Sequence, residues 1–363
     1  MGAYTTINDP SAHFQTLLYT GNASANRALT NDGNSDLQPD WLWIHPRNNS
    51  GGYFNALQDT SRGVTKILSS NTNSAEVSTS AQVLSVQSDG FTVDDNADSQ
   101  NYVNLNSINY VAWQWKANGG TTTSVGVGTN DGNTTTACVR QVNTTAGFAI
   151  ITYTADSNGE QFLEHGLGVA PTFLLVKDRG NAESWIVGHE GNLGTTAFHN
   201  YLELNTNTSS QTENRWLNTA PTSTAINIGP DNSVGGNGRN YVCYAFAPIQ
   251  GYSKFGKYTG NGLADGPYIH TGFKPAWVMV KRTDANNNWH MHDNKRVTSN
   301  PNNLTLYANL TNADASEDLD MLSNGFKLRE SGGGYNADTG TYIYMAFAEK
   351  PFVSSEGVPT TAV

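Results

Sequence analysis

The chain repeats itself three times, and this repetition limits its fold more than any other feature of the sequence. Each copy contains a segment that starts with proline and continues into apolar residues, at Pro39, Pro171 and Pro275. A tyrosine-led segment follows each proline after 71, 70 or 67 residues. We therefore expect three copies of one structural unit.

Further markers keep the same order in each copy. A Tyr-Thr pair comes 17 to 20 residues before each proline, and an aromatic residue follows each proline by 14 positions. A Gly-Phe pair precedes the last segment in the first and third copies, whereas the second copy has a degraded version, Ile226-Asn-Ile228. The aligned aromatic markers are Tyr19, Tyr153 and Tyr258; Tyr53, Trp185 and Trp289; and Tyr110, Tyr241 and Tyr342.

Each copy has the pattern of β structure. In the tyrosine-led segments bulky side chains alternate with smaller or more polar ones, which predicts strands with one bulky face packed against a second sheet. The proline-led segments are apolar on both faces, which is typical of central strands, and a proline at a strand start costs no ladder hydrogen bond. The bulky positions are Val111, Trp113 and Trp115; Val242, Tyr244 and Phe246; and Ile343, Met345 and Phe347.

The predicted fold class is all-β, with three tandem jelly-roll-like β-sandwich modules. Turn signals such as Asp89-Gly90 and Asn324-Gly325 separate the predicted strands. The expected domains are a first module at 1–117, a Gly/Thr-rich connection at 118–146 that holds a strand or a free linker, a second module at 147–250, a third module at 251–352 and a polar tail at 353–363.

Composition excludes several classes of protein. The 363 residues carry a net charge of -11, so a general nucleic-acid binder is not expected. Lys and Glu are scarce beside Asn, Thr and Gly, which argues against a helical bundle. No apolar run reaches the roughly 20 residues of a membrane helix, and the N-terminus lacks the charged and apolar regions of a signal peptide.

Several long motifs of the chain resemble repeat-bearing virion proteins of marine tailed bacteriophages, including those of cyanobacteria. The resemblance covers most of the chain. It implies a tail-fibre-like or structural component of a phage particle, and it brings no catalytic residues with it. The motifs that carry it are residues 14–21, 33–44, 61–66, 110–120, 144–154 and 165–171.

A search for catalytic patterns favours a protein that is not an enzyme. A glycosidase needs two carboxylates on either side of the scissile bond, and no Glu-x-Asp-x-Glu strand pattern is present. No Gly-x-Ser-x-Gly turn, P-loop or dinucleotide fingerprint is present. His290 and His292 share a strand face but lack a clear third zinc ligand, so we interpret them as hydrogen-bonded strand residues.

Two other patterns involve charged residues. Asp59-x-x-Arg62 and Asp293-x-x-Arg296 recur in the first and third modules, and we expect structural ion pairs that hold a loop. Calcium is an alternative use of the acidic turns, which place oxygen ligands at alternate positions but lack the full EF-hand spacing. Its candidate ligands are Asp32, Asn34, Asp36, Asp94, Asn96 and Asp98. No other cofactor is expected.

Aromatic residues on loops are candidates for carbohydrate binding. Trp216 and Tyr335 lie outside the repeated markers, and Tyr53 follows a Gly-Gly turn. Tyr53, Trp185 and Trp289 share one offset, so a core position is the first interpretation for these three and carbohydrate contact the alternative. The two cysteines, Cys138 and Cys243, are expected to be buried thiols, although a disulfide between them stays open.

The sequence thus predicts a virion structural protein that is assembled in the host cytoplasm. The first hypothesis is a tail-fibre-like, receptor-binding adhesin that contacts host-surface glycan and forms a homotrimer. The alternative is a head decoration or head-fibre protein, which the lack of heptads or a stalk repeat keeps in contention. A carbohydrate-active enzyme is the third. The expected partners are other virion proteins, without nucleic acid or membrane insertion. A single chain acting as a pseudo-trimer is a further hypothesis.

Overall fold

A computed structural model of the chain describes residues 3–48, 52–95, 102–130, 132–157, 159–192, 194, 196 and 198–360. Over these residues the chain is almost entirely antiparallel β structure, with one short 3-10 helix, η1 (Pro10–Ala12). The prediction of an all-β fold is confirmed. In this part of the chain no helix is both long enough and apolar enough to span a bilayer.

The first repeat, residues 1–117, forms a four-stranded sheet in the order β1-β9-β3-β4, a three-stranded sheet β2-β8-β7 and a small pair β5-β6. Its strands are β1 (Phe14–Thr20), β2 (Arg27–Leu29), β3 (Trp41–Pro46), β4 (Ala56–Asp59), β5 (Lys66–Ile67), β6 (Val77–Ser78), β7 (Val83–Gln87), β8 (Gly90–Val93) and β9 (Asn109–Trp115).

The predicted connection, residues 118–146, is not a free linker. It contains β10 (Thr123–Val125), β11 (Thr129–Asn130), β12 (Asn133–Thr134) and β13 (Cys138–Asn143). Two of these strands join the second repeat, residues 147–250, in an eight-stranded sheet β10-β13-β14-β21-β16-β17-β18-β19. The strands of the second repeat are β14 (Phe148–Thr154), β15 (Gln161–Glu164), β16 (Phe173–Asp178), β17 (Ile186–His189), β18 (Asn200–Glu203), β19 (Gln211–Thr212), β20 (Ala225–Ile228) and β21 (Asn240–Phe246).

The third repeat, residues 251–352, is one continuous sheet in the order β22-β29-β24-β25-β26-β27-β28-β23. Its strand β24 begins before Pro275, and the pairing of β24 with β29 shifts register on both sides of that proline, which cannot donate a ladder hydrogen bond. The strands are β22 (Ser253–Thr259), β23 (Tyr268–His270), β24 (Phe273–Arg282), β25 (Trp289–Asp293), β26 (Asn302–Tyr307), β27 (Ala315–Leu322), β28 (Gly325–Leu328) and β29 (Thr341–Pro351).

The same four strands recur in the same order in each repeat. The runs β1-β9-β3-β4, β14-β21-β16-β17 and β22-β29-β24-β25 place the proline-led strand in the middle of its sheet, as its two apolar faces predict. The two tyrosine markers of each repeat recur together because they lie on the first and last strands, which pair with each other and stack the two tyrosine rings. These stacks are Tyr19–Tyr110 at 5.1 Å, Tyr153–Tyr241 at 5.1 Å and Tyr258–Tyr342 at 4.9 Å between ring centroids.

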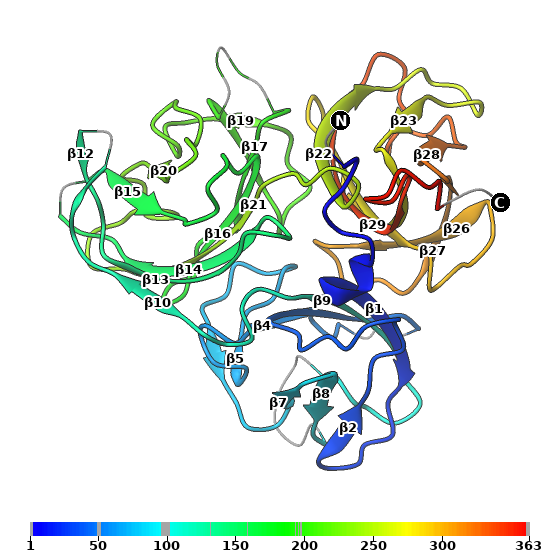
Figure 1. Ribbon diagram of the computed structural model, residues 1–363, viewed down its shortest axis with the longest axis horizontal. Helices are drawn as coiled ribbons and strands as arrows, with labels where there is room; N and C mark the ends of the chain where they lie inside the picture. Colours follow the sequence, from blue (N-terminus) through cyan, green and yellow to red (C-terminus); the bar gives the residue numbers. More distant parts are fainter. Residues whose placement is uncertain are drawn as a thin grey trace.

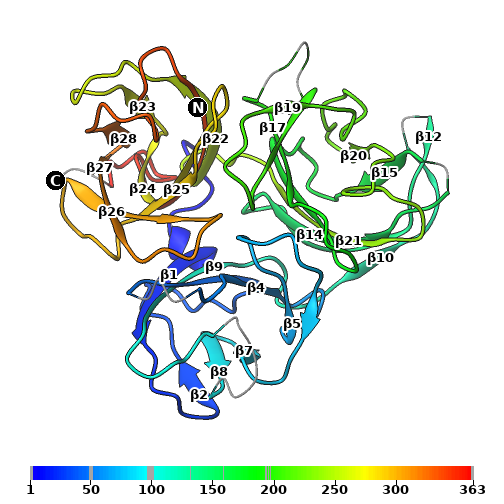
Figure 2. The same cartoon turned by 180° about the vertical axis from the view of Figure 1, so that it is seen from behind.

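The bulky faces of the three sheets meet in one central core. Figures 1 and 2 show three lobes around a common centre. The sheet that each bulky face packs against belongs to the other repeats, while the opposite face packs within its own repeat. Aromatic contacts cross all three boundaries between repeats: Trp41–Tyr244 at 4.5 Å, Phe246–Phe347 at 5.8 Å and Trp115–Phe347 at 5.6 Å between centroids.

Equivalent backbone hydrogen bonds close the three repeats into a ring. In each, a loop N–H of one repeat donates to the carbonyl that follows the proline-led strand of the next repeat. The three bonds, each 2.8 Å long, are Glu76 to Arg179, Ser210 to Thr283 and Asp314 to Arg47. The third bond returns from the last repeat to the first, so the arrangement has pseudo-threefold symmetry.

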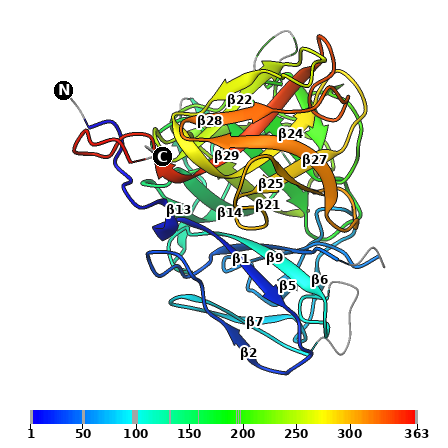
Figure 3. The same ribbon diagram turned by 90° about the vertical axis from the view of Figure 1, so that its right-hand side faces the viewer.

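The two ends of the described chain pack together on the third repeat (Figure 3). The Tyr4 hydroxyl donates to the carbonyl of Gly272 at 2.7 Å. The Asn8 amide donates to the Ser355 hydroxyl at 2.7 Å, and the Ser355 N–H donates back to Asn8 at 2.8 Å. The first part of the predicted polar tail is therefore held against the N-terminal segment.

Candidate functional site

Trp216 and Tyr335 are not exposed platforms for sugars. Only 1% of Trp216 and 2% of Tyr335 is exposed to solvent. The indole of Trp216 covers Gly188 so closely that a Cβ there would lie 2.9 Å from the ring. The Tyr335 hydroxyl donates to the carbonyl of Asp318 at 2.8 Å. Both carbohydrate-binding predictions are therefore wrong, because the two rings fill the cores of their repeats.

The position of Tyr335 was recognisable from the repeats. It stands seven residues before Tyr342, as Val103 stands before Tyr110 and Val234 before Tyr241. The carbonyls at these three positions accept equivalent hydrogen bonds from the first-strand tyrosines: Tyr19 to Val103, Tyr153 to Val234 and Tyr258 to Tyr335, at 2.7, 2.6 and 2.7 Å. Tyr335 is therefore a repeat marker, and its constant spacing from Tyr342 is the signal that could have identified it.

Tyr53 lies outside the central core, unlike the two tryptophans aligned with it. Trp185 and Trp289 are 0% and 1% exposed, as predicted for core residues, whereas Tyr53 is half-buried and packs its ring against Tyr102. The structural equivalent of the tryptophans is Asn55, because the three share a hydrogen bond from the backbone N–H to an asparagine 16 or 20 residues later. These bonds are Asn55 to Asn71, Trp185 to Asn205 and Trp289 to Asn309. The core prediction for Tyr53 is wrong, and its role in carbohydrate binding stays a prediction.

The two Asp-x-x-Arg motifs form buried ion pairs, as predicted. Arg62 pairs with Asp59, and the equivalent Arg296 pairs with Asp293 at 2.6 Å; none of these side chains is exposed. Each aspartate also accepts a hydrogen bond from a neighbouring repeat. The Tyr244 hydroxyl donates to Asp59 at 2.7 Å, and the Trp113 indole N–H donates to Asp293 at 3.1 Å. The pairs therefore join repeats as well as hold loops.

The second repeat has no Asp-x-x-Arg motif, and its neighbour offers no side-chain donor at the matching position. His189 occupies the aspartate position, and Met345 of the third repeat occupies the position of Tyr244 and Trp113. The His189 ring nitrogen Nε2 contacts the carbonyl oxygen of Tyr344 at 3.2 Å instead. At the boundary between the second and third repeats, the replacement of aspartate by His189 thus accompanies the replacement of a side-chain donor by Met345.

Among the described calcium candidates, Asp32 and Asp94 already have other partners. Both carboxylate oxygens of Asp32 lie 2.9 Å from the Lys295 Nζ, while Asp36 is exposed and Asp94 accepts a hydrogen bond from the Asn26 N–H. Asn34 lines a groove described below, and Asn96 and Asp98 fall outside the described residues. No group of three or more His, Cys, Asp or Glu side chains that could hold a metal ion is present in the described part of the chain.

His290 and His292 are interior strand residues, in agreement with their interpretation as hydrogen-bonded. His290 Nδ1 lies 2.5 Å from a Glu317 carboxylate oxygen, and His292 Nδ1 lies 3.3 Å from the Asn302 amide oxygen. Burial lowers the pKa of His292 to about 4.

The thiols of Cys138 and Cys243 are also buried and do not form a disulfide. Burial raises the pKa of Cys138 to about 11, so this thiol is unreactive at neutral pH.

Three boundaries between the repeats have related positions, and cavities lie at two of them. Each boundary lies between the first strand of one repeat and the turn that follows the hairpin strand of its neighbour, and we name the three the β14, β1 and β22 grooves. In the β14 groove the chain fills the space itself, because β13 pairs with β14 along its length. The Gln141 side chain donates to the hydroxyls of Thr60 and Ser61, both at 2.9 Å. Its oxygen accepts the backbone N–H groups of Asn118 and Gly120.

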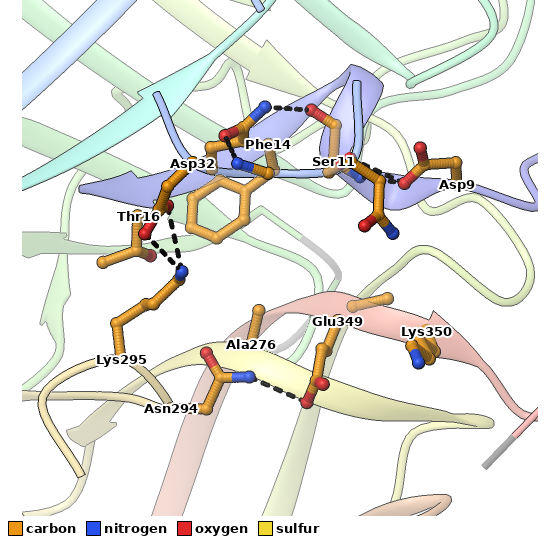
Figure 4. Close-up of a pocket in the computed structure, with 14 residues that line it drawn as sticks. Asp9, Ser11, Phe14, Thr16, Asp32, Ala276, Asn294, Lys295, Glu349 and Lys350 are labelled. Atoms are coloured by element: carbon orange, nitrogen blue, oxygen red, sulfur yellow. Dashed lines mark hydrogen bonds and ion pairs between the residues drawn. The ribbon is translucent and has the colours of Figure 1, made fainter. Parts of the chain in front are cut away.

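The β1 groove is partly closed by an ion pair (Figure 4). Lys295 of the third repeat reaches Asp32 of the first repeat across a cavity of about 300 Å³. Asn294 and Glu349 hydrogen-bond on the third-repeat side at 2.8 Å. The hydroxyl of Thr16, a residue that is 4% exposed, lines this cavity and has no hydrogen-bond partner in the part of the chain that the structure describes.

The β22 groove is larger, with a volume of about 630 Å³. It is bordered by Lys257, Tyr258 and Thr259 of the third repeat and by Gly191 and Asn192 of the second. Asn192 is 2% exposed, and its Nδ2 has no hydrogen-bond partner among the described residues. Sequence reasoning missed all three grooves, since residues from different repeats form them.

The fold and its grooves thus define a class: an all-β chain whose three repeats close around one core. A family model described as "Domain of unknown function (DUF7483)" matches residues 9–351. The chain belongs to this family, and the family unit spans all three repeats. No curated protein and no solved structure matches the chain.

Proposed function

We propose that this chain is a virion structural protein, a tail-fibre-like element without enzymatic activity that docks as one rigid unit. The observation that carries the proposal is the ring of three repeats around a shared core. A particle component of threefold symmetry presents three equivalent patches, and a symmetric partner must offer three matching ones. This chain offers three related surfaces from one polypeptide, and its motifs resemble phage virion proteins.

Adhesion to host-surface glycan is the first role proposed for the exposed loops, since loops on a rigid scaffold commonly carry binding residues. Tyr53 is the aromatic candidate that keeps part of its ring surface in solvent. Head decoration is the second role, because a pseudo-threefold body also suits a threefold position on a shell. Docking at either place leaves the other side of the ring free.

Labelling of purified virions with an antibody under electron microscopy tests the proposal. Label at the tail or its fibres is expected. Label over the head would replace adhesion with decoration, and absence of label from the particle would contradict a virion function. Hydrolysis of host polysaccharide by the purified chain would contradict the non-enzymatic part.

A further inference from the structure

We propose that the outer edge of β22 binds an extended strand of a partner protein, which adds to the sheet in antiparallel orientation. This inference is independent of the virion proposal, because it rests on comparing the three grooves within the molecule. Of the three equivalent first strands, β14 already pairs with a strand on its outer side, whereas β22 and β1 are edge strands. Unpaired strand edges are the sites at which proteins add strands from other chains.

The β14 groove shows what such an added strand looks like. Strand β13 runs antiparallel to β14 and places Asn143 opposite Phe148, Gln141 opposite Ile150 and Val139 opposite Thr152. Superposition of the ladders places Ser253, Phe255 and Lys257 of β22 at the positions of Phe148, Ile150 and Thr152. A partner strand of about six residues would therefore lie beside β22 as β13 lies beside β14.

Alternation of the backbone identifies the groups that would bind it. The carbonyl of Tyr252 accepts the N–H of Ala348, and the N–H of Gly260 donates to Gly340, so the even-numbered residues of β22 face β29. Because backbone groups alternate sides along a strand, those of the odd-numbered residues face the open edge. They belong to Phe255, Lys257 and Thr259, and they have no hydrogen-bond partner in the described structure.

The side chains of the β22 groove favour a strand that carries an acidic residue opposite Lys257. Lys257 is exposed and forms no ion pair with the described residues, while Asp284, which lines the same groove, pairs with Arg282, so an acidic residue opposite Lys257 would complete an ion pair. The unpartnered Nδ2 of buried Asn192 lines the same groove and can donate to an entering chain. A strand with glutamate at the position of Val139 would place a carboxylate opposite Lys257 and would also pair with the outward backbone groups of β22.

The β1 edge is less suited to the same role. The Lys295–Asp32 ion pair crosses its groove, and Arg27 already donates to the carbonyl of Thr20 at 2.6 Å. Thr20 is one of the residues whose backbone faces the open side of β1, since His13 and Gly21 bond toward β9. Within the described part of the chain, the outward backbone groups of β22 from Phe255 to Thr259 have no hydrogen-bond partner.

The test uses the full chain and a fluorescein-labelled peptide, Ser-Glu-Arg-Gln-Val-Asn, which is the β13 sequence with Cys138→Ser and Val139→Glu. Binding is measured by fluorescence anisotropy, and hydrogen exchange identifies the edge. We expect slower exchange at the amides of Phe255, Lys257 and Thr259 when peptide is bound. The amides of Gly256 and Tyr258 already face β29 and should change little.

Variants at one position separate backbone pairing from charge. Lys257→Pro removes an outward N–H but no bond to β29, and it should weaken peptide binding about tenfold or more. The matched control Leu18→Pro, at the equivalent position of β1, should leave binding unchanged. Lys257→Glu should also weaken binding, and a peptide with lysine in place of its glutamate should recover it.

Three results would overturn the proposal. The first is no detectable peptide binding with no protection of the three amides. The second is equal affinity for the wild type and both Lys257 variants. The third is a concentration-dependent dimer that Lys257→Pro abolishes, because the edge would then pair with a second copy of the chain.

Discussion

At the scale of single residues, polar side chains buried between the repeats hold the ring together. The buried aspartates Asp59 and Asp293 each contact an arginine of their own repeat and a donor of the next repeat. A buried charge that loses its partner is costly, whereas exposed pairs contribute little. The hydrogen-bonded aspartates are therefore the residues at which a single substitution should damage the assembly most.

Arg296→Met should destabilise the chain by about 3–5 kcal/mol, because it leaves the carboxylate of Asp293 buried and unpaired. The control Arg282→Met breaks the partly exposed pair with Asp284 and should cost about 1 kcal/mol or less. Urea denaturation of the three proteins measures the difference. Equal losses in the two variants would show that the Arg296 pair is not important for stability.

Buried histidines should make the fold sensitive to acid. Burial lowers the pKa of His45, His165, His189 and His292 to about 4, below the ordinary value near 6.5. Between these values the unfolded chain binds more protons than the folded chain, so the free energy of unfolding falls as pH drops from about 6.5 to 4. Above pH 6.5 these four histidines should make no further change to the free energy of unfolding.

His189→Gln tests this pH dependence at one site. Glutamine can donate to the carbonyl of Tyr344 and accept from the N–H of Gly191, as His189 does, but it does not titrate. Denaturation at a series of pH values should show a pH dependence reduced by about one proton. An unchanged slope between pH 4 and 6.5 would mean that His189 is not neutral in the fold.

At the scale of elements, strand β13 makes one groove of the ring different from the other two. Gln141 is 1% exposed and bonds to both the first repeat and the connection. Gln141→Ala should lower the free energy of unfolding by about 1–3 kcal/mol, since four polar groups lose a partner. Gln87→Ala, which removes one hydrogen bond from a partly exposed side chain, should cost less. Chemical denaturation compares them, and the reverse order would contradict the account.

The sequence predicted the elements better than their partners. Alternation in segments such as Val111-Ala-Trp113-Gln-Trp115 identified the bulky faces, all of which lie in the central core. A period of two shows that a face is buried, but not which surface covers it. Asn55 was not aligned with Trp185 and Trp289 because the first hairpin is two residues longer than the second. The burial of Trp216 could not be predicted because it depends on Gly188, a distant residue whose missing side chain leaves room for the indole.

At the scale of the whole molecule, the shared core makes the three repeats one folding unit. The first repeat alone would expose Trp41, Trp43, Trp113 and Trp115 on one sheet face. Such a contiguous apolar patch favours aggregation. We expect calorimetry of the whole chain to give one transition with equal calorimetric and van't Hoff enthalpies. A fragment of residues 1–117 should not fold by itself; three separate transitions or a soluble, folded fragment would contradict this.

One chain supplies the three lobes that three subunits would otherwise supply, and the mass of the protein in solution is the sharpest test of this arrangement. Light scattering during size-exclusion chromatography should give a mass near the 39.1 kDa of a single chain. A monomer with this mass would leave the pseudo-threefold ring complete without other copies. A mass about three times larger would contradict the account, because the threefold arrangement would then come from three chains.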